Sequence, residues 1–162
     1  MQILTAPDEK KFDLPSLFLA GGISNCGDWQ SEMIALLAIP DLVLLNPRRD
    51  RFDMSDPTVS EAQIAWEYRY LRQATAVLFW FPPETLCPIT LFELGGALER
   101  SAPVFVGCHT DYARQSDVRV QISLARPEIR VVSVLADLAK QIQEWGTSKK
   151  AGREPLTARS PL

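Results

Sequence analysis

A glutamate that follows a strand-like run is the residue of this chain best placed to carry out chemistry. The apolar run Ala76–Phe81 predicts a buried strand, and Glu93 lies near the start of the helix-like segment after it. The prolines of Pro82–Pro88 exclude a central strand and a helix, so this stretch must loop over the strand's carboxyl end. Ligands bind at that end of an open parallel sheet. We therefore expect Glu93 to face a ligand, ionised by the partial positive charge of the helix's first turn, as a nucleophile requires.

Two glycines that follow Glu93 support a binding role for the same helix. Gly95 and Gly96 would each cost about 1 kcal/mol in a helix interior, so we expect a ligand or another backbone to approach them closely. The alternative is that Glu93 is a solvated residue at the start of a helix that packs tightly on a strand.

Glu67 is the second candidate carboxylate. Ile64, Glu67 and Leu71 share one helical face by their spacing, which places the carboxylate on a partly apolar stripe. A buried carboxylate needs a partner or a function. The alternative is a structural ion pair with Arg69, Arg72 or Arg48.

Two further segments follow predicted strands and could contact a ligand. Gly21–Asn25 could bring backbone N–H groups close to a ligand oxygen, or it could be a tight turn. It has neither the dinucleotide-binding nor the P-loop spacing of glycines. Arg48 and Arg49 could bind a phosphate or carboxylate, or could hold Glu67 or Asp50 in place.

The remaining reactive side chains argue against a metal or a disulfide framework. The three cysteines are widely spaced, and His109 is the only histidine, which excludes most histidine triads and metal sites. We expect no metal and no organic cofactor. Trp66, Trp80, Tyr68 and Tyr70 could stack on a base or simply belong to the core.

Composition limits the class of protein. The 162 residues carry a formal net charge of -3 and are 46% hydrophobic, as expected for one globular domain with a real core. The acidic balance argues against a nucleic-acid partner. The sequence shows no signal-like start and no apolar run long enough to span a bilayer, so we expect a soluble cytoplasmic protein without membrane contact.

Short apolar runs alternate with helical patterns along the chain. This order predicts an α/β fold, a doubly wound flavodoxin-like or Rossmann-like sandwich with a roughly five-stranded parallel sheet. We expect a single domain over residues 1–146 and a tail at 147–162 that is mobile or packs on another subunit. The predicted strands lie at 16–20, 42–45, 76–81, 103–107 and 129–134, and the predicted helices at about 28–39, 57–73, 89–100, 117–125 and 135–145.

Five short motifs in register resemble the nucleoside 2-deoxyribosyltransferase-like family over roughly Leu17 to Val106. Each motif is weak alone, but their common order and spacing are fairly specific. The motifs are Phe18–Ile23, Asn46–Arg49, Gln63–Glu67, Phe79–Pro82 and Leu91–Gly95.

The resemblance implies that Glu93 attacks the anomeric carbon of a 2-deoxyribosyl group, releases the base and passes the sugar to another base or to water. Glu67 matches the family's other carboxylate, which is expected to hold the sugar or position the nucleophile. The first-strand loop is expected to border the sugar and, in nucleotide-hydrolysing relatives, the 5′-phosphate. The expected substrate-binding residues are Phe18, Gly21, Gly22, Ile23, Ser24, Asn46, Arg48, Arg49, Trp66 and Cys87.

The chain departs from the family pattern at Cys87, which stands where an aspartate commonly handles the departing base. A thiol is a poor substitute, so Glu84 of the same loop is a third candidate acid. Two rival functions follow from this departure: an N-glycohydrolase of ribosyl or NAD-type substrates, and a nucleotide-binding module without turnover. The resemblance also implies a homodimer or larger homo-oligomer, with residues 112–123 or the tail reaching the neighbouring subunit.

Overall fold

A computed structural model of the chain describes residues 1–49 and 56–151, with side chains described through Ser148. Asp50 and the part of the predicted tail beyond Ala151 lie outside the described residues. The strands are β1 (Gln2–Thr5), β2 (Ser16–Gly21), β3 (Val43–Asn46), β4 (Ala76–Phe81) and β5 (Val104–Cys108). The helices are α1 (Trp29–Leu36), α2 (Pro57–Gln73), α3 (Pro88–Leu98), α4 (Gln115–Ala125) and α5 (Leu135–Ala151).

The strands form one parallel sheet in the order β1-β3-β2-β4-β5, which confirms the predicted fold class. β2 lies in the centre, with Phe18 opposite both Leu45 of β3 and Val77 of β4. The connection after β2 leads to β3 on one side, whereas the connection after β4 leads to β5 on the other. The two loops therefore diverge between β2 and β4, and this topological switch point is where such sheets bind ligands.

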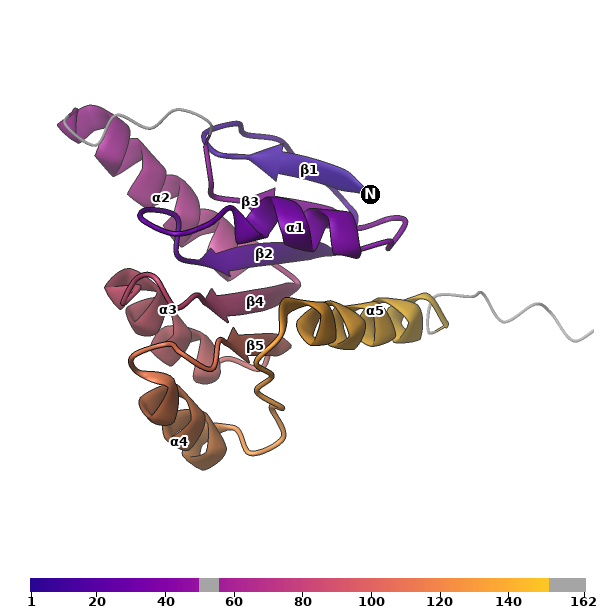
Figure 1. Cartoon of the computed structure of the whole chain (residues 1–162). Helices are drawn as coiled ribbons and strands as arrows, with labels where there is room; N and C mark the ends of the chain where they lie inside the picture. The colour runs from indigo at the N-terminus through magenta and orange to yellow at the C-terminus, as the bar shows by residue number, and fades with distance from the viewer. Residues whose placement is uncertain (50–55, 152–162) are drawn as a thin grey trace, which may run out of the picture.

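Helices cover both faces of the sheet (Figure 1). On one face α1 and α5 pack on apolar side chains that include Leu19 of β2 and Leu78 of β4. On the other face α2, α3 and α4 pack on a core that includes Phe18 and Phe79. Neighbouring strand residues point to opposite faces, so an almost uniformly apolar strand serves both cores.

Two of the predicted helix starts are confirmed by their caps. Asp28 accepts a hydrogen bond from the backbone N–H of Ser31 at 3.1 Å and begins α1. Asp56 accepts from the N–H of Thr58 at 2.9 Å, and Pro57 is the first residue of α2, where its missing N–H costs nothing. α5 continues to Ala151, so the residues from 147 to 151, expected to be tail, are helical.

One predicted strand is wrong. The segment 129–134 makes only an isolated bridge, with Val132 beside Gly107 of β5. Two of its other carbonyls accept from side chains: Arg119 donates to the carbonyl of Val131 at 3.2 Å, and Gln141 to that of Arg130 at 3.2 Å. The fifth strand is instead β1, at the opposite edge.

None of the helices in the described ranges is both long enough and apolar enough to cross a membrane.

Candidate functional site

A cleft of about 650 Å³ opens over the carboxyl ends of β2 and β4, between α2 and α3. Its size falls within the range of small-molecule sites. It coincides with the switch point of the sheet, as the sequence predicts. The lining residues are Phe18, Ala20, Gly21, Gly22, Ile23, Ser24, Pro47, Arg49, Ser60, Gln63, Ile64, Glu67, Tyr68, Leu71, Arg72, Thr85, Cys87, Pro88, Ile89, Thr90, Phe92, Glu93, Gly96, Ala97 and Arg100.

Gly21 and Gly22, at the end of β2, form one wall of the cleft. A side chain at either position would come too close to its neighbours. A Cβ at Gly21 would lie 2.4 Å from the ring of Trp29 and 2.6 Å from the carbonyl oxygen of Trp80. A Cβ at Gly22 would lie 3.0 Å from the sulfur atoms of both Cys26 and Cys87. The backbone of this loop is thus packed between α1 and the loop that precedes α3.

Arg48 holds this wall in place. Its Nε donates to Gln30 Oε1 at 2.7 Å and lies 3.3 Å from Asp28 Oδ1, and its Nη2 donates to the carbonyl of Gly27 at 2.9 Å. Trp29 Nε1 donates to the carbonyl of Gly22 at 2.8 Å. The Arg48 guanidinium is therefore committed to the loop, and Arg49 is the arginine of this pair that lines the cleft.

Glu67 of α2 and Glu93 of α3 face the same cleft, as the sequence predicts. Glu67 is partly buried, and its Oε1 accepts a hydrogen bond from Gln63 Nε2 at 2.7 Å. Burial raises the pKa of Glu67, while the Gln63 hydrogen bond and the charge of Arg49 act in the opposite direction. Of the other proposed partners, Arg69 pairs with Glu9 at 2.6 Å, and Arg72 stacks over the Tyr68 ring in the same cleft.

The expectation that Glu93 lies in the first helical turn and is ionised by it is wrong. Glu93 is the sixth residue of α3, beyond the turn whose free N–H groups stabilise a negative charge. Burial raises the pKa of Glu93 to about 7, and the neighbouring charge of Glu67 adds to this effect, whereas Arg72 lowers it. Near neutral pH both the protonated and the ionised forms of Glu93 are therefore populated.

Cys87 begins α3 in the left-handed backbone region, with φ 47° and ψ 53°. That conformation costs a non-glycine residue about 1–3 kcal/mol and is found mainly at functional sites. It places a buried thiol at the cleft wall beside Gly22. Burial raises the pKa of Cys87 to about 12, so the thiol keeps its proton throughout the neutral range.

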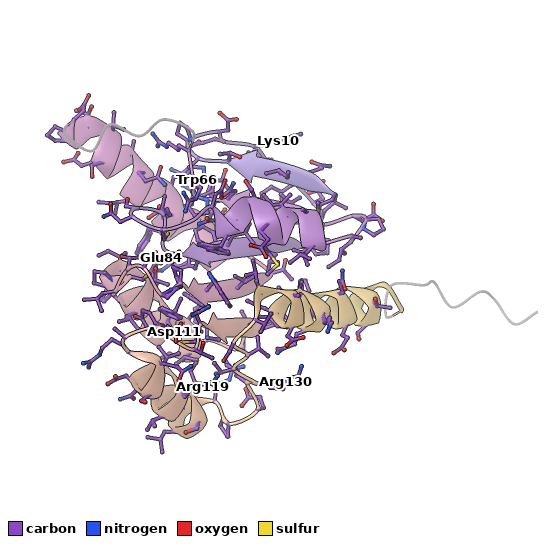
Figure 2. All side chains as sticks on the ribbon, viewed as in Figure 1. Lys10, Trp66, Glu84, Asp111, Arg119 and Arg130 are labelled. Carbon is purple, nitrogen blue, oxygen red and sulfur yellow. The ribbon has the colours of Figure 1, made fainter. Side chains whose placement is uncertain are left out.

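Four predicted site residues do not line the cleft: Arg48, whose guanidinium is bonded to the first-strand loop, and three others. Trp66 is 2% exposed and packs on Phe18 and Tyr70 in the core, which favours the core interpretation of this aromatic. Asn46 ends β3 and accepts a hydrogen bond from the backbone N–H of Arg48 at 3.0 Å. Glu84 is exposed and lies beyond the carboxyl-terminal tips of the strands (Figure 2).

Several cleft residues were not predicted as site residues. Gln63 lies one turn before Glu67, and Arg100 lies seven residues after Glu93, just beyond the end of α3 at Leu98. An interval of four places Gln63 and Glu67 on one helical face, so this spacing was the signal that could have identified Gln63. Within residues 1–49 and 56–151, no group of three or more His, Cys, Asp or Glu side chains could hold a metal ion.

The chain matches a known protein family. Residues 14–112 match the model of a family described as nucleoside 2-deoxyribosyltransferase like. This segment is more than half of the 162 residues and includes every residue that lines the cleft. A search of the curated proteins gave no match.

Proposed function

Because the chain belongs to the nucleoside 2-deoxyribosyltransferase-like family, we propose that it cleaves the N-glycosidic bond of a nucleoside or nucleotide. Family membership supports glycosyl transfer in the broad sense. The finer proposal rests on one observation: Glu67 and Glu93 line the same small-molecule cleft at the switch point of the sheet, close enough for their charges to interact. Most glycosidases cleave the bond with a pair of carboxyl groups that flank it.

In the proposed reaction, a carboxylate oxygen of Glu93 attacks the anomeric carbon and forms a glycosyl ester. The bond to the base breaks, and the base leaves with its electron pair. A second base or a water molecule then attacks the same carbon, which breaks the ester and restores the Glu93 carboxylate. Transfer and hydrolysis differ only in this acceptor.

A departing base also needs a proton, and the carboxyl pair is the nearest source. Glu93 must ionise before it attacks, so its proton can pass to Glu67 and from there to the base. The Cys87 thiol, with a pKa raised to about 12, is a poor donor at neutral pH. Glu84 is exposed and outside the cleft lining, so it is the weaker candidate acid.

Cys87 also favours a second candidate function, the hydrolysis of a ribosyl substrate with a cationic base such as nicotinamide. A cationic base leaves as a neutral molecule and needs no proton. This reaction would use Glu93 in the same way and would tolerate a thiol where the family commonly has an acid.

The test is chromatographic detection of free base from deoxy- and ribonucleosides, their 5′-monophosphates and NAD, with and without an acceptor base. We expect Glu93→Ala to reduce release at least 1000-fold, because the nucleophile is lost. Glu144→Ala, on the exposed side of α5, is the matched control and should keep full activity.

The outcomes separate the candidate functions. A new nucleoside that forms only with acceptor indicates a transferase, and release from NAD alone indicates the second function. Full activity in Glu93→Ala would refute the role of Glu93 as the nucleophile. If no substrate is cleaved but one of them raises the melting temperature, the chain is a nucleotide-binding module.

A further inference from the structure

Gln63 is a buried amide at the base of the cleft, 6% exposed, on the helix that carries Glu67. Its Nε2 donates to the backbone carbonyl of Pro47 at 2.8 Å and to Glu67 Oε1 at 2.7 Å. Gln63 thus connects the Glu67 carboxylate to the loop that follows β3. Both distances are those of well-formed hydrogen bonds.

These two partners determine which way the amide faces. A carbonyl and a carboxylate are both acceptors, so the NH₂ group must point at them, and both of its hydrogens are used. The Oε1 atom of Gln63 is consequently left buried without a donor among the described residues. An unsatisfied buried oxygen costs about 1–3 kcal/mol. The amide is therefore placed here for its two donated hydrogen bonds, to Pro47 and to Glu67.

The charged groups around the pair show what the amide does. Glu67 faces Gln63 on its own helix and Arg49 of the preceding loop, and Glu93 faces Glu67 and Arg72. A hydrogen bond donated to a carboxylate favours its ionised form, and an ionised neighbour favours the protonated form of the second carboxyl. The other titratable side chains that line the cleft are Tyr68, Cys87 and Arg100.

We propose that Gln63 is a positioning residue that keeps Glu67 ionised and thereby favours a proton on Glu93. It occupies Oε1 of Glu67, so Oε2 is the oxygen available to receive that proton. This inference rests on the proposed function and deepens it. The ionised Glu67 carboxylate is the group that can accept the proton of Glu93 when Glu93 ionises to attack the sugar.

The test is a carbon-13 NMR titration of the glutamate carboxyl groups in the protein without substrate. Glu93→Gln and Glu67→Gln assign the two signals. In wild type, Glu93 should titrate at the higher pH. Gln63→Met has nearly the same shape without the donor, and we expect it to raise the pKa of Glu67 by about 1 and to lower that of Glu93.

Unchanged titration of both carboxyl groups in folded Gln63→Met would overturn the proposal. If that variant does not fold, Glu67→Gln decides the matter, because removing the Glu67 charge must lower the pKa of Glu93 if the pair is coupled. A Glu93 that titrates as in wild type would also overturn it.

Activity gives a separate readout. If the chain releases base, Gln63→Met should shift the rising limb of the kcat profile with pH while leaving KM nearly unchanged. The titration needs no substrate, so altered carboxyl titration without any base release would support the role of Gln63 and refute only the proposed function.

Discussion

The proton on Glu93 has a consequence for stability as well as for activity. The pKa of Glu93 is about 7 in the folded chain and 4.5 ordinarily, so between these values only the folded state holds the proton. The unfolded chain then binds fewer protons, and the contribution of this group to the free energy of unfolding falls as the pH rises. A pKa difference of this size corresponds to about 3 kcal/mol.

We therefore expect Glu93→Gln to match wild type in stability near pH 5 and to exceed it at pH 8 by up to about 3 kcal/mol. The neutral amide has the shape of the protonated acid and cannot acquire a buried charge. Urea unfolding at both pH values measures the difference, with Glu144→Gln as an exposed control. A constant gap between Glu93→Gln and wild type at the two pH values would contradict the raised pKa.

The sequence pointed to both carboxylates that line the cleft. It did not show that Arg48 holds the loop in place while Arg49 lines the cleft. Glu67 and Glu93 follow from helical spacing and from the position of a loop after a strand, which are local patterns. Arg48 and Arg49 are neighbours after a strand, so their side chains point to opposite faces of the sheet. Which face holds α1 and which holds the cleft depends on the crossovers, and no single motif contains that information.

At the scale of the elements, α3 offers a matched pair of glycines. A Cβ at either Gly95 or Gly96 would meet nothing within 4 Å among the residues that the structure describes, but only Gly96 lines the cleft. The expected close approach of another backbone is therefore wrong. The expected approach of a ligand stays a prediction at Gly96. Both glycines leave the helix less stable than alanine would.

We expect Gly95→Ala and Gly96→Ala each to stabilise the protein by about 0.5–1 kcal/mol, because alanine is the better helix former. Only Gly96→Ala should weaken substrate binding, since its methyl group enters the cleft. Thermal unfolding measures the first effect, and KM in the base-release assay measures the second. Equal KM values for the two variants would show that the ligand does not reach this turn of α3.

The predicted strands were confirmed where an apolar run of sequence is also buried in the middle of the sheet. β4 is apolar throughout, β2 is apolar from Leu17 to Ala20, and both lie in the middle of the sheet. β1 is four residues long at an edge, and its first two residues are exposed, so its pattern carries little signal. The segment 129–134 has the composition of a strand, but side chains of α4 and α5 take up its outer hydrogen bonds.

At the scale of the whole molecule, the mouth of the cleft is unusually apolar for an exposed surface. Ile64 and Tyr68 of α2 are 62% and 60% exposed, and Ile89 and Phe92 of α3 are 65% and 81% exposed. All four line the same cleft and together make an apolar rim. Contiguous exposed apolar surface marks an interaction site. We propose that a second copy of the chain covers this rim, which would close the cleft on its open side.

This proposal predicts that Phe92→Asp converts a dimer into a monomer, because a buried charge would replace an interface aromatic. A loss of about 2 kcal/mol raises the dimer Kd roughly 30-fold. Sedimentation velocity over a range of concentrations measures the change. Val134→Asp is the control, since Val134 is also exposed, at 55%, but lies before α5 on the other side of the sheet.

A second variant locates the interface. Leu124 of α4 is 76% exposed and lies beside the 112–123 segment that the family resemblance implicates in subunit contact. If Leu124→Asp dissociates the dimer and Phe92→Asp does not, the subunits meet at α4 and the rim is left for the substrate. Base release should then survive dissociation. If Phe92→Asp both dissociates the dimer and reduces kcat with the carboxyl titration unchanged, the second subunit completes the site by excluding water from the cleft.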